Sequence, residues 1–378
     1  MSLGIFLTTK KEAGGTYQYS LTLLDALKKT SLKKNLFIFS PKDIFRKRRQ
    51  VKFFKIRRYL GSLYDGLINP LGVNLKKQST FNVDLMIYPA PTTVCLKQKF
   101  PYIVCVHDLQ HRINPQFPEV SQKGERQKRE FLYKNCLKKA TTIIAESETG
   151  KKHIQKFYKI PGSKIAVLPY IPPTYLKTKI EPGFLKKVRK KYSLPQKYIF
   201  YPAQFWPHKN HKTIIRALAT LKKRGVSVKA VFVGQKMEKW GEYKRVMKLA
   251  NKLKVKKQIK HLGYVKNKEM IALYKMAICL VMPTFFGPTN IPPLEAFYLG
   301  CPAITSSIEG IKEQVGKAAV LINPVDKKAL AEAILKIYKD PKLRTKLKKA
   351  GYQKIKSWTA KDFAEKLERI IKKTKEKL

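Results

Sequence analysis

The stretch Phe286-Gly287-Pro288-Thr289-Asn290-Ile291-Pro292-Pro293-Leu294-Glu295 joins two apolar segments of the chain. The segment before it, Ile278–Met282, is apolar and is followed by Pro283, which predicts a short buried strand. The segment at its end, Pro293–Leu299, predicts an apolar helix that has Glu295 near its start. A strand, a turn-rich loop and a helix in this order form one unit of a parallel α/β sheet.

The same alternation of strands and helices extends outward from this stretch over the whole chain. In the first half we expect strands at Leu3–Thr8, Leu36–Phe39, Val83–Tyr88, Ile103–Val106, Thr142–Ala145 and Ile165–Val167. In the second half we expect them at Tyr198–Pro202, Ala230–Gly234, Ile259–Leu262, Ile278–Met282, Ala303–Thr305 and Val320–Ile322. The pattern predicts an α/β protein with two doubly wound, Rossmann-like parallel sheets, whose ligand sites face a shared cleft.

A proline-rich passage, Pro169–Pro173, interrupts this alternation and marks a linker between the domains. We therefore expect a first domain over residues 1–173 and a second over 174–357, followed by a helical segment over 358–378. A length of 378 residues suits two domains, and an apolar fraction of 44% suits a folded protein. No apolar run reaches the roughly 20 residues of a membrane-spanning helix, and the first apolar run is too short for a signal peptide.

The five cysteines are odd in number and lack the spacing of a metal or redox pair, which predicts reduced core residues of a cytoplasmic protein. The formal charge is +55, from 80 basic and 25 acidic residues, and a field of this size attracts polyanions. Because lysine occurs in nearly every segment, we interpret most of this charge as compositional bias on solvated faces.

Two loops carry residues suited to binding a phosphate. Gly14 and Gly15 follow the first strand, with Thr16 next to them, at the start of a helix whose amides can face an anion, although such a pair is more often a tight turn. Lys209 lies in the loop that enters the first helix of the second half, where its ammonium can contact a diphosphate. A lysine in this chain is usually a solvated surface charge, so its position carries the prediction.

Three further side chains follow predicted strands or begin helices. His107 and Asp108 follow a buried strand and are expected at its carboxyl end, where the alternatives are a satisfied loop histidine and a helix N-cap. Glu295 is suited to accept hydrogen bonds from two neighbouring ribose hydroxyls. The alternative is structural, because a carboxylate near the start of a helix interacts favourably with the helix dipole.

Several of these elements together resemble the retaining glycosyltransferases with the GT-B fold, known as group 1 or family 4. The matching elements are Lys209, Glu295–Pro302, Gly310–Gly316 and Asn323-Pro324, and the resemblance is most specific over Tyr198–Pro324. It implies that a nucleotide diphosphate sugar binds the second domain and the acceptor binds the first. It also implies that the final helix crosses back to the first domain, and that Gly15 and His107 occupy the positions of the family's donor-phosphate glycine and cleft histidine.

Two positions depart from the family pattern. Gly287 stands where the family has its first glutamate, and Gln204 stands where it has an arginine beside the diphosphate. The Phe-Gly-Pro-Thr-Asn run resembles a subgroup found among mannosyltransferases and related transferases of surface polysaccharide synthesis. In that subgroup we expect Thr289 and Asn290, with Ile291 next to them, to take over contacts to the donor.

By this resemblance the chain is expected to be a metal-independent hexosyltransferase without a cofactor. The favoured donor is a GDP-sugar carrying a mannose-like hexose, and the acceptor is a glycan or a lipid-linked sugar. Expected catalytic residues are His107, Lys209 and Asn290, and expected acceptor contacts are His107 and Asp108. Expected donor contacts are Gly15, Thr16, Gln204, Lys209, Thr289, Asn290, Ile291 and Glu295. The alternatives are a sugar epimerase or phosphorylase of the same fold and a nucleic-acid-binding protein.

One basic segment stands out because its cations alternate with aromatic residues. It comprises Phe45, Arg46, Lys47, Arg48, Arg49, Lys52, Phe53, Phe54, Lys55, Arg57, Arg58 and Tyr59. Such a segment can dock on an anionic membrane or bind nucleic acid. A lipid-linked acceptor favours the membrane, so we expect a cytoplasmic enzyme peripheral to the inner face of the cytoplasmic membrane, with no specific nucleic acid partner.

Replacing Arg46–Arg49 with neutral residues is expected to weaken binding to anionic vesicles at low salt, because each basic residue near such a surface contributes about 1 kcal/mol. Co-sedimentation with vesicles of anionic and of neutral lipid measures the effect. Unchanged sedimentation with anionic vesicles would leave lysine bias as the explanation of the charge.

Overall fold

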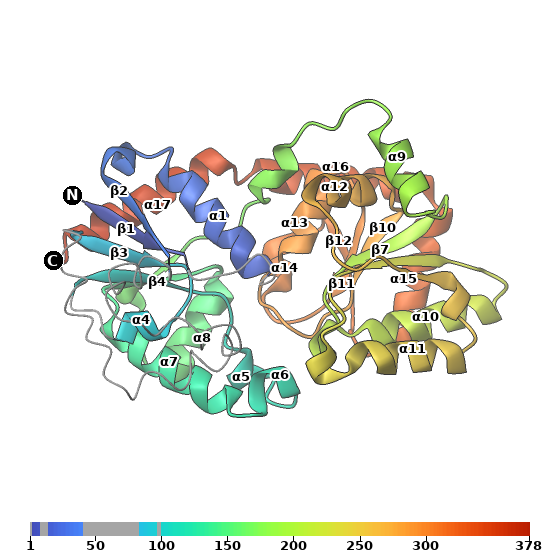
Figure 1. Cartoon of the computed structure of the whole chain (residues 1–378), viewed down its shortest axis with the longest axis horizontal. Coiled ribbons are helices and arrows are strands. Elements are labelled where there is room, and N and C mark those ends of the chain that lie inside the picture. Colours follow the sequence, from blue (N-terminus) through green and yellow to red (C-terminus); the bar gives the residue numbers. More distant parts are fainter. Residues whose placement is uncertain (1, 8–13, 41–82, 97–99) are drawn as a thin grey trace, which may run out of the picture. The chain divides into compact units, whose positions relative to one another are not determined.

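The computed structural model describes residues 2–7, 14–40, 83–96 and 100–378, drawn in colour in Figure 1. The basic aromatic segment of residues 45–59 lies outside these ranges. The chain divides into two compact units. Unit 1 contains Met1–Ile113, Lys123–Pro169 and Ala360–Leu378, and unit 2 contains Asn114–Gln122 and Tyr170–Thr359.

Unit 1 is built on a six-stranded parallel sheet with strand order β2-β1-β3-β4-β5-β6. The strands are β1 (Leu3–Phe6), β2 (Leu36–Phe39), β3 (Leu85–Tyr88), β4 (Tyr102–Val106), β5 (Thr142–Ala145) and β6 (Ile165–Val167). The central strands β1, β3, β4 and β5 are buried at every position, as expected where helices cover both faces of a parallel sheet. Within this unit, α1 (Gly15–Leu27) and α17 (Ala360–Lys375) lie on one side of the sheet, and α4 (Thr93–Leu96), α7 (Glu125–Lys139) and α8 (Glu148–Tyr158) lie on the other (Figure 1).

Unit 2 repeats this plan with strand order β12-β11-β10-β7-β8-β9, all parallel. The strands are β7 (Tyr198–Pro202), β8 (Lys229–Val233), β9 (Ile259–His261), β10 (Cys279–Met282), β11 (Ala303–Ser306) and β12 (Ala319–Ile322). The helices α10 (His211–Lys223) and α11 (Glu242–Lys252) lie on one side, and α12 (Asn267–Met276) and α13 (Ile291–Tyr298) on the other (Figure 1). The predicted class, two doubly wound parallel-sheet domains, is therefore confirmed.

Two of the remaining helices of unit 2 start at aspartates that cap them. Asp326 accepts hydrogen bonds from the first-turn amides of Lys328 and Ala329, at 2.8 and 2.9 Å, and so begins α15 (Lys327–Lys339). Asp340 accepts from Leu343 N at 2.9 Å at the start of α16 (Pro341–Lys356), whose proline occupies the first turn. Within unit 2, α9 (Phe184–Lys191) packs against α12, and α14 (Ile311–Val315) is a short helix between β11 and β12.

Each unit contains a segment that is separated in the chain from the rest of that unit. α17 packs on α1 within unit 1, where the Thr374 hydroxyl donates to the Thr142 hydroxyl at 2.8 Å. Residues 114–122, which the sequence placed in the first domain, group with unit 2. The physical reason is the burial of Glu119 against His208 and the ring contacts of Phe117. The change between the units falls between Pro169 and Tyr170, within the predicted linker.

The loop after β7 passes close to the backbone at Gly234, which follows β8. A Cβ atom on Gly234 would lie 2.6 Å from the carbonyl carbon and oxygen of Ala203 and 2.7 Å from Gln204 N. Gly234 also has a φ of 138°, which side chains rarely adopt. A hydrogen bond from Phe205 N to Gln235 O at 3.0 Å joins the two segments at this contact.

Gly234→Ala is therefore expected to destabilise the fold by more than the roughly 1–3 kcal/mol of backbone strain alone, because it adds a clash with the Ala203 backbone. Gly225→Ala is the matched control. Gly225 has a φ of 75°, and a Cβ added there would meet no atom of the described residues within 4 Å beyond its chain neighbours. Urea unfolding of both variants separates the strain from the clash. Equal losses would show that the close approach contributes nothing.

Candidate functional site

The strand order of unit 2 reverses between β7 and β10. From β7 the chain builds β8 and β9 on one side, and it then returns to build β10, β11 and β12 on the other. In open parallel sheets, the crevice at the carboxyl ends of the strands flanking such a reversal is where ligands bind. The loop carrying Lys209 follows β7, and the loop carrying Thr289 and Asn290 follows β10, so the topology brings these predicted residues to one place.

The loops at this reversal are bonded into one body. The carbonyl oxygen of His208 accepts from Phe285 N at 2.9 Å and from the Thr284 hydroxyl at 3.2 Å. The side-chain amide of Asn210 donates to Pro283 O at 2.9 Å and to Pro324 O at 2.7 Å. The loops that follow β7, β10 and β12 are thereby held together.

Lys209 lies in the short 3-10 helix η6 (Pro207–Lys209) and its side chain is half-buried. Its carbonyl oxygen accepts from the buried Tyr201 hydroxyl at 2.9 Å, and its amide donates to Trp206 O at 3.0 Å. The backbone of Lys209 is thus fixed on both sides. Gln204 occupies the position where the family pattern has an arginine. Its side-chain oxygen accepts a hydrogen bond from the indole N–H of Trp206 at 2.7 Å.

Asn290 is the N-cap of α13 and is buried, with 9% of its surface exposed. Its backbone N–H donates to Gln314 Oε1 at 2.9 Å, and Gln314 Nε2 donates to its carbonyl at 2.8 Å. Its own side-chain amide donates to Phe286 O at 3.0 Å, which closes the loop. Asn290 therefore shapes the loop that begins α13, while Thr289 next to it is half-buried and Ile291 is buried.

Glu295 lies in the middle of α13 and is only 7% exposed. Its Oε1 accepts from the Tyr175 hydroxyl and its Oε2 from the Tyr274 hydroxyl, each at 2.7 Å. Burial raises the pKa of Glu295, and the hydrogen bonds from the two tyrosines oppose that rise. Tyr175 comes from η5 (Thr174–Lys177), which follows the linker, and Tyr274 from α12, so this carboxylate joins three elements.

Unit 1 contains a second group of polar side chains, where β4 and β5 end. His107 follows β4, and its Nδ1 contacts the carboxylate of Glu146, which follows the neighbouring strand β5. Burial disfavours the charged imidazole, but the Glu146 carboxylate outweighs burial and raises the pKa of His107 above 6.5. Tyr19 of α1 meets the imidazole edge-on, with ring centroids 5.1 Å apart.

The other predicted residues of unit 1 have local structural contacts. Asp108 accepts from Gln110 N at 2.9 Å, a local bond just before the helix Gln110–Ile113, and lies 3.5 Å from Arg129 Nη1. Gly15 and Thr16 are the first residues of α1, and Gly14 before them has a φ of 61° that favours glycine. The N-cap of α1 has no side-chain capping bond.

Sequence reasoning missed the side chains that hold the predicted ones: Glu146 at His107, and Tyr175 and Tyr274 at Glu295. For Glu146 a signal was available, since it directly follows a predicted strand and parallel neighbours end at one edge. For Tyr175 no signal existed, because it lies 120 positions from Glu295 in a short 3-10 helix that follows the linker.

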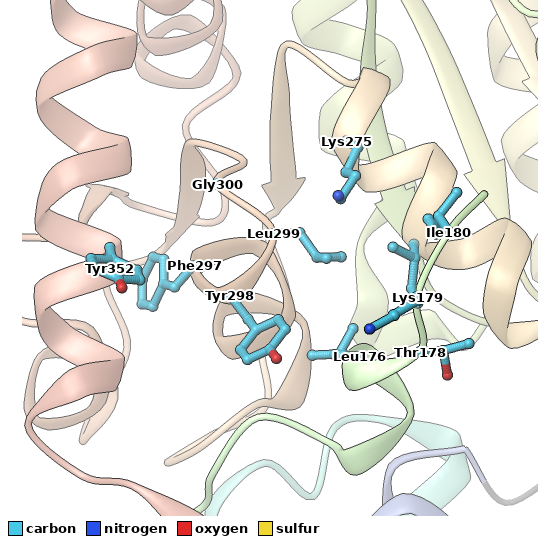
Figure 2. A pocket seen from close by; sticks show the side chains of 11 residues that line it. Leu176, Thr178, Lys179, Ile180, Lys275, Phe297, Tyr298, Leu299, Gly300 and Tyr352 are labelled. Carbon is cyan, nitrogen blue, oxygen red and sulfur yellow. The ribbon is translucent and has the colours of Figure 1, made fainter. Parts of the chain in front are cut away.

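A pocket of about 420 Å³ lies elsewhere in unit 2 (Figure 2). Its walls include Leu176 and Thr178 after the linker and Tyr298 and Leu299 at the end of α13. Lys275 also lines it. Leu299 shortly precedes β11 and Lys275 shortly precedes β10, so the pocket lies at the amino ends of these strands, opposite the loop that carries Lys209.

Residues 186–354 match the family described as Glycosyl transferases group 1. The serotype-specific mannosyltransferase WbdA of Escherichia coli is 25% identical over 256 residues, which cover 65% of this chain and 30% of that protein. The O-antigen chain mannosyltransferase RfbU of Salmonella typhimurium is 26% identical over 211 residues, which cover 56% of this chain and 55% of that protein. The chain thus spans less than two thirds of the length of either relative.

Among solved structures, Anabaena Alr3699/HepE in complex with UDP-glucose is similar to the whole chain. The TM-score is 0.76 at 17% identity, and the match covers 99% of this chain and 100% of that one. At this identity the likeness establishes a shared two-domain fold. Among the described residues, no helix combines the length and the apolar character needed to cross a membrane.

Glu146→Gln is expected to lower the pKa of His107, because it removes the charge that stabilises the imidazolium against burial. A raised histidine pKa stabilises the fold at low pH, and this contribution is lost as pH rises through the folded-state pKa above 6.5. NMR titration of the imidazole measures the shift directly. Glu130→Gln, which alters the surroundings of His111 instead, is the control. A wild-type His107 that titrates below 6.5 would contradict the assignment.

Proposed function

Because residues 186–354 match the family of group 1 glycosyl transferases, we propose that the protein moves a hexose from a nucleotide diphosphate sugar to a glycan or lipid-linked acceptor. In this proposal the transfer retains the anomeric configuration and needs no metal ion. The observation that carries it is the position of Lys209, whose loop is bonded to the start of the β10–α13 loop at the strand-order reversal of unit 2.

The chemistry of the reaction fits what this site offers. Breaking the bond between the sugar and the diphosphate places growing negative charge on the phosphates, and fixed positive groups lower the barrier most when they are oriented beforehand. Lys209 supplies an ammonium at this site, and the backbone that carries it is fixed by bonds to Tyr201 and Trp206. Gln204, Thr289 and Asn290 are proposed as neutral contacts to the phosphates or the sugar.

The names of two relatives support a mannose-like hexose as the transferred sugar. WbdA and RfbU are described as mannosyltransferases, and a GDP-sugar is the donor we favour on that basis. HepE is described in complex with UDP-glucose, which supports the wider class of nucleotide diphosphate sugars. The O-antigen role in the name of RfbU supports surface polysaccharide synthesis as the setting.

Glu295 is proposed to accept the ribose hydroxyls of the donor. Each carboxylate oxygen has two acceptor positions, so the bonds from Tyr175 and Tyr274 leave room for one more donor on each oxygen. Burial disfavours the charged form of the Glu295 carboxylate, and additional hydrogen bonds from a ribose would stabilise that form.

The acceptor is proposed to bind unit 1 beside His107, with Asp108 adjacent. The imidazole is fixed by Glu146 and Tyr19, so its orientation is set before a sugar arrives. The basic aromatic segment of residues 45–59 is proposed to bring the enzyme to the inner face of the cytoplasmic membrane, where a lipid-linked acceptor is available.

Lys209→Ala is expected to weaken binding of GDP or UDP about 10- to 100-fold, because a charge-assisted hydrogen bond contributes about 1.5–3 kcal/mol. The loss should be smaller for GMP or UMP, which lack the second phosphate. Lys212→Ala is the control, since Lys212 lies in the same region but pairs with Glu242. Calorimetric titration measures all four ligands, and equal affinities in wild type and Lys209→Ala would refute the phosphate role.

The wild-type protein itself tests the donor class. A thermal-shift screen of nucleotide diphosphate sugars should identify the donor, since a ligand at about 100 times its dissociation constant stabilises the fold by about 2.7 kcal/mol. Stabilisation by none of these sugars would overturn the proposed function.

A further inference from the structure

Glu119 is a buried carboxylate at the donor site that comes from an unexpected part of the chain. It lies in α6 (Pro118–Ser121), within the segment Asn114–Gln122 that interrupts unit 1 and groups with unit 2. Only 8% of its surface is exposed. A charged side chain is seldom buried to this degree unless it is bonded to a specific partner.

That partner is His208, which directly precedes Lys209. Glu119 Oε1 lies 2.5 Å from His208 Nδ1 and accepts the backbone N–H of His208 at 2.9 Å. One carboxylate oxygen therefore fixes both the ring and the backbone of this residue. The other oxygen, Oε2, is buried as well, and the bonds of Oε1 to His208 are the contacts through which Glu119 can act on the site.

His208 in turn contacts the loop that carries Thr289 and Asn290. Its ring stacks on Phe286, with centroids 3.8 Å apart and ring planes 5° from parallel. Its carbonyl accepts the bonds from the loop after β10 described above. Phe117, two residues before Glu119, meets Phe286 edge-on at 5.2 Å and contacts Phe285 at 5.1 Å.

We propose that Glu119 is a positioning residue of the donor site, which holds His208 so that Lys209 and the Phe286–Asn290 loop keep the arrangement that binds the diphosphate sugar. This inference rests on the proposed function of the site. It adds to that function a carboxylate from the first half of the chain, at a site whose own loop has Gly287 in place of a glutamate. Preorganised groups lose less free energy on binding than mobile ones, which is the physical basis of the effect.

The test compares the affinity of wild type, Glu119→Gln and Glu119→Ala for GDP and UDP by calorimetry. We expect Glu119→Ala to bind the preferred diphosphate about 10-fold more weakly, the effect of about 1.4 kcal/mol in binding free energy. Glu119→Gln keeps an acceptor for the His208 N–H but loses the charge, so its affinity is expected to lie between those of wild type and Glu119→Ala. If the alanine variant does not fold, Glu119→Gln alone provides the test. Glu332→Gln is the control, because it removes a surface carboxylate that is paired with Arg224.

A double-mutant cycle separates positioning from a general loss of stability. If Glu119 acts through Lys209, Glu119→Ala costs less affinity in a Lys209→Ala background than in wild type. A purely structural carboxylate would lower the thermal midpoint and leave the affinity of the folded protein unchanged, and that result would overturn the inference while leaving the proposed function standing. A wild-type protein that binds neither diphosphate would overturn both.

Discussion

The reversal of strand order between β7 and β10 is the constraint on which the proposed donor site depends. Two parallel strands that are neighbours in the sheet but far apart in the chain leave a gap between the helices that follow them. That gap is filled by loops, and here the loops bond to one another through His208 and Asn210. The buried strands of unit 2 fix where the loops start, and the bonds between the loops fix where Lys209 and Asn290 lie.

Most of the sheet framework was predictable because parallel strands covered on both faces are short, apolar and regularly spaced. All six expected strands of each sheet are present, with ends shifted by at most two residues: the first ends at Phe6 rather than Thr8, and the third begins at Leu85 rather than Val83. The helix α16 was not predicted. Its sequence is dominated by lysine, and only Leu347 and Gly351 on it are buried, so its apolar periodicity is faint.

The site was predictable only at the level of loops. A residue that follows a strand can be assigned to the carboxyl edge of a sheet, which places Lys209 and His107 correctly in their loops. The partners of these residues depend on how distant segments pack, so neither Glu119 at His208 nor Tyr175 at Glu295 has a local pattern that reveals it. The structure thus adds the supporting side chains, and these decide how rigidly the predicted ones are held.

The place of α17 in unit 1 has a consequence for the order in which the protein is made. Domains commonly fold during synthesis, with the first-made one folding first. Here the ribosome completes all of unit 2 before it makes Phe363, Leu367 and Ile371, which are fully buried. Unit 2 can therefore finish folding while unit 1 still exposes the apolar face of α1 that α17 will cover. During that interval we expect a chaperone to be needed at the exposed apolar face of α1, in the first half of the nascent chain, rather than at the second half.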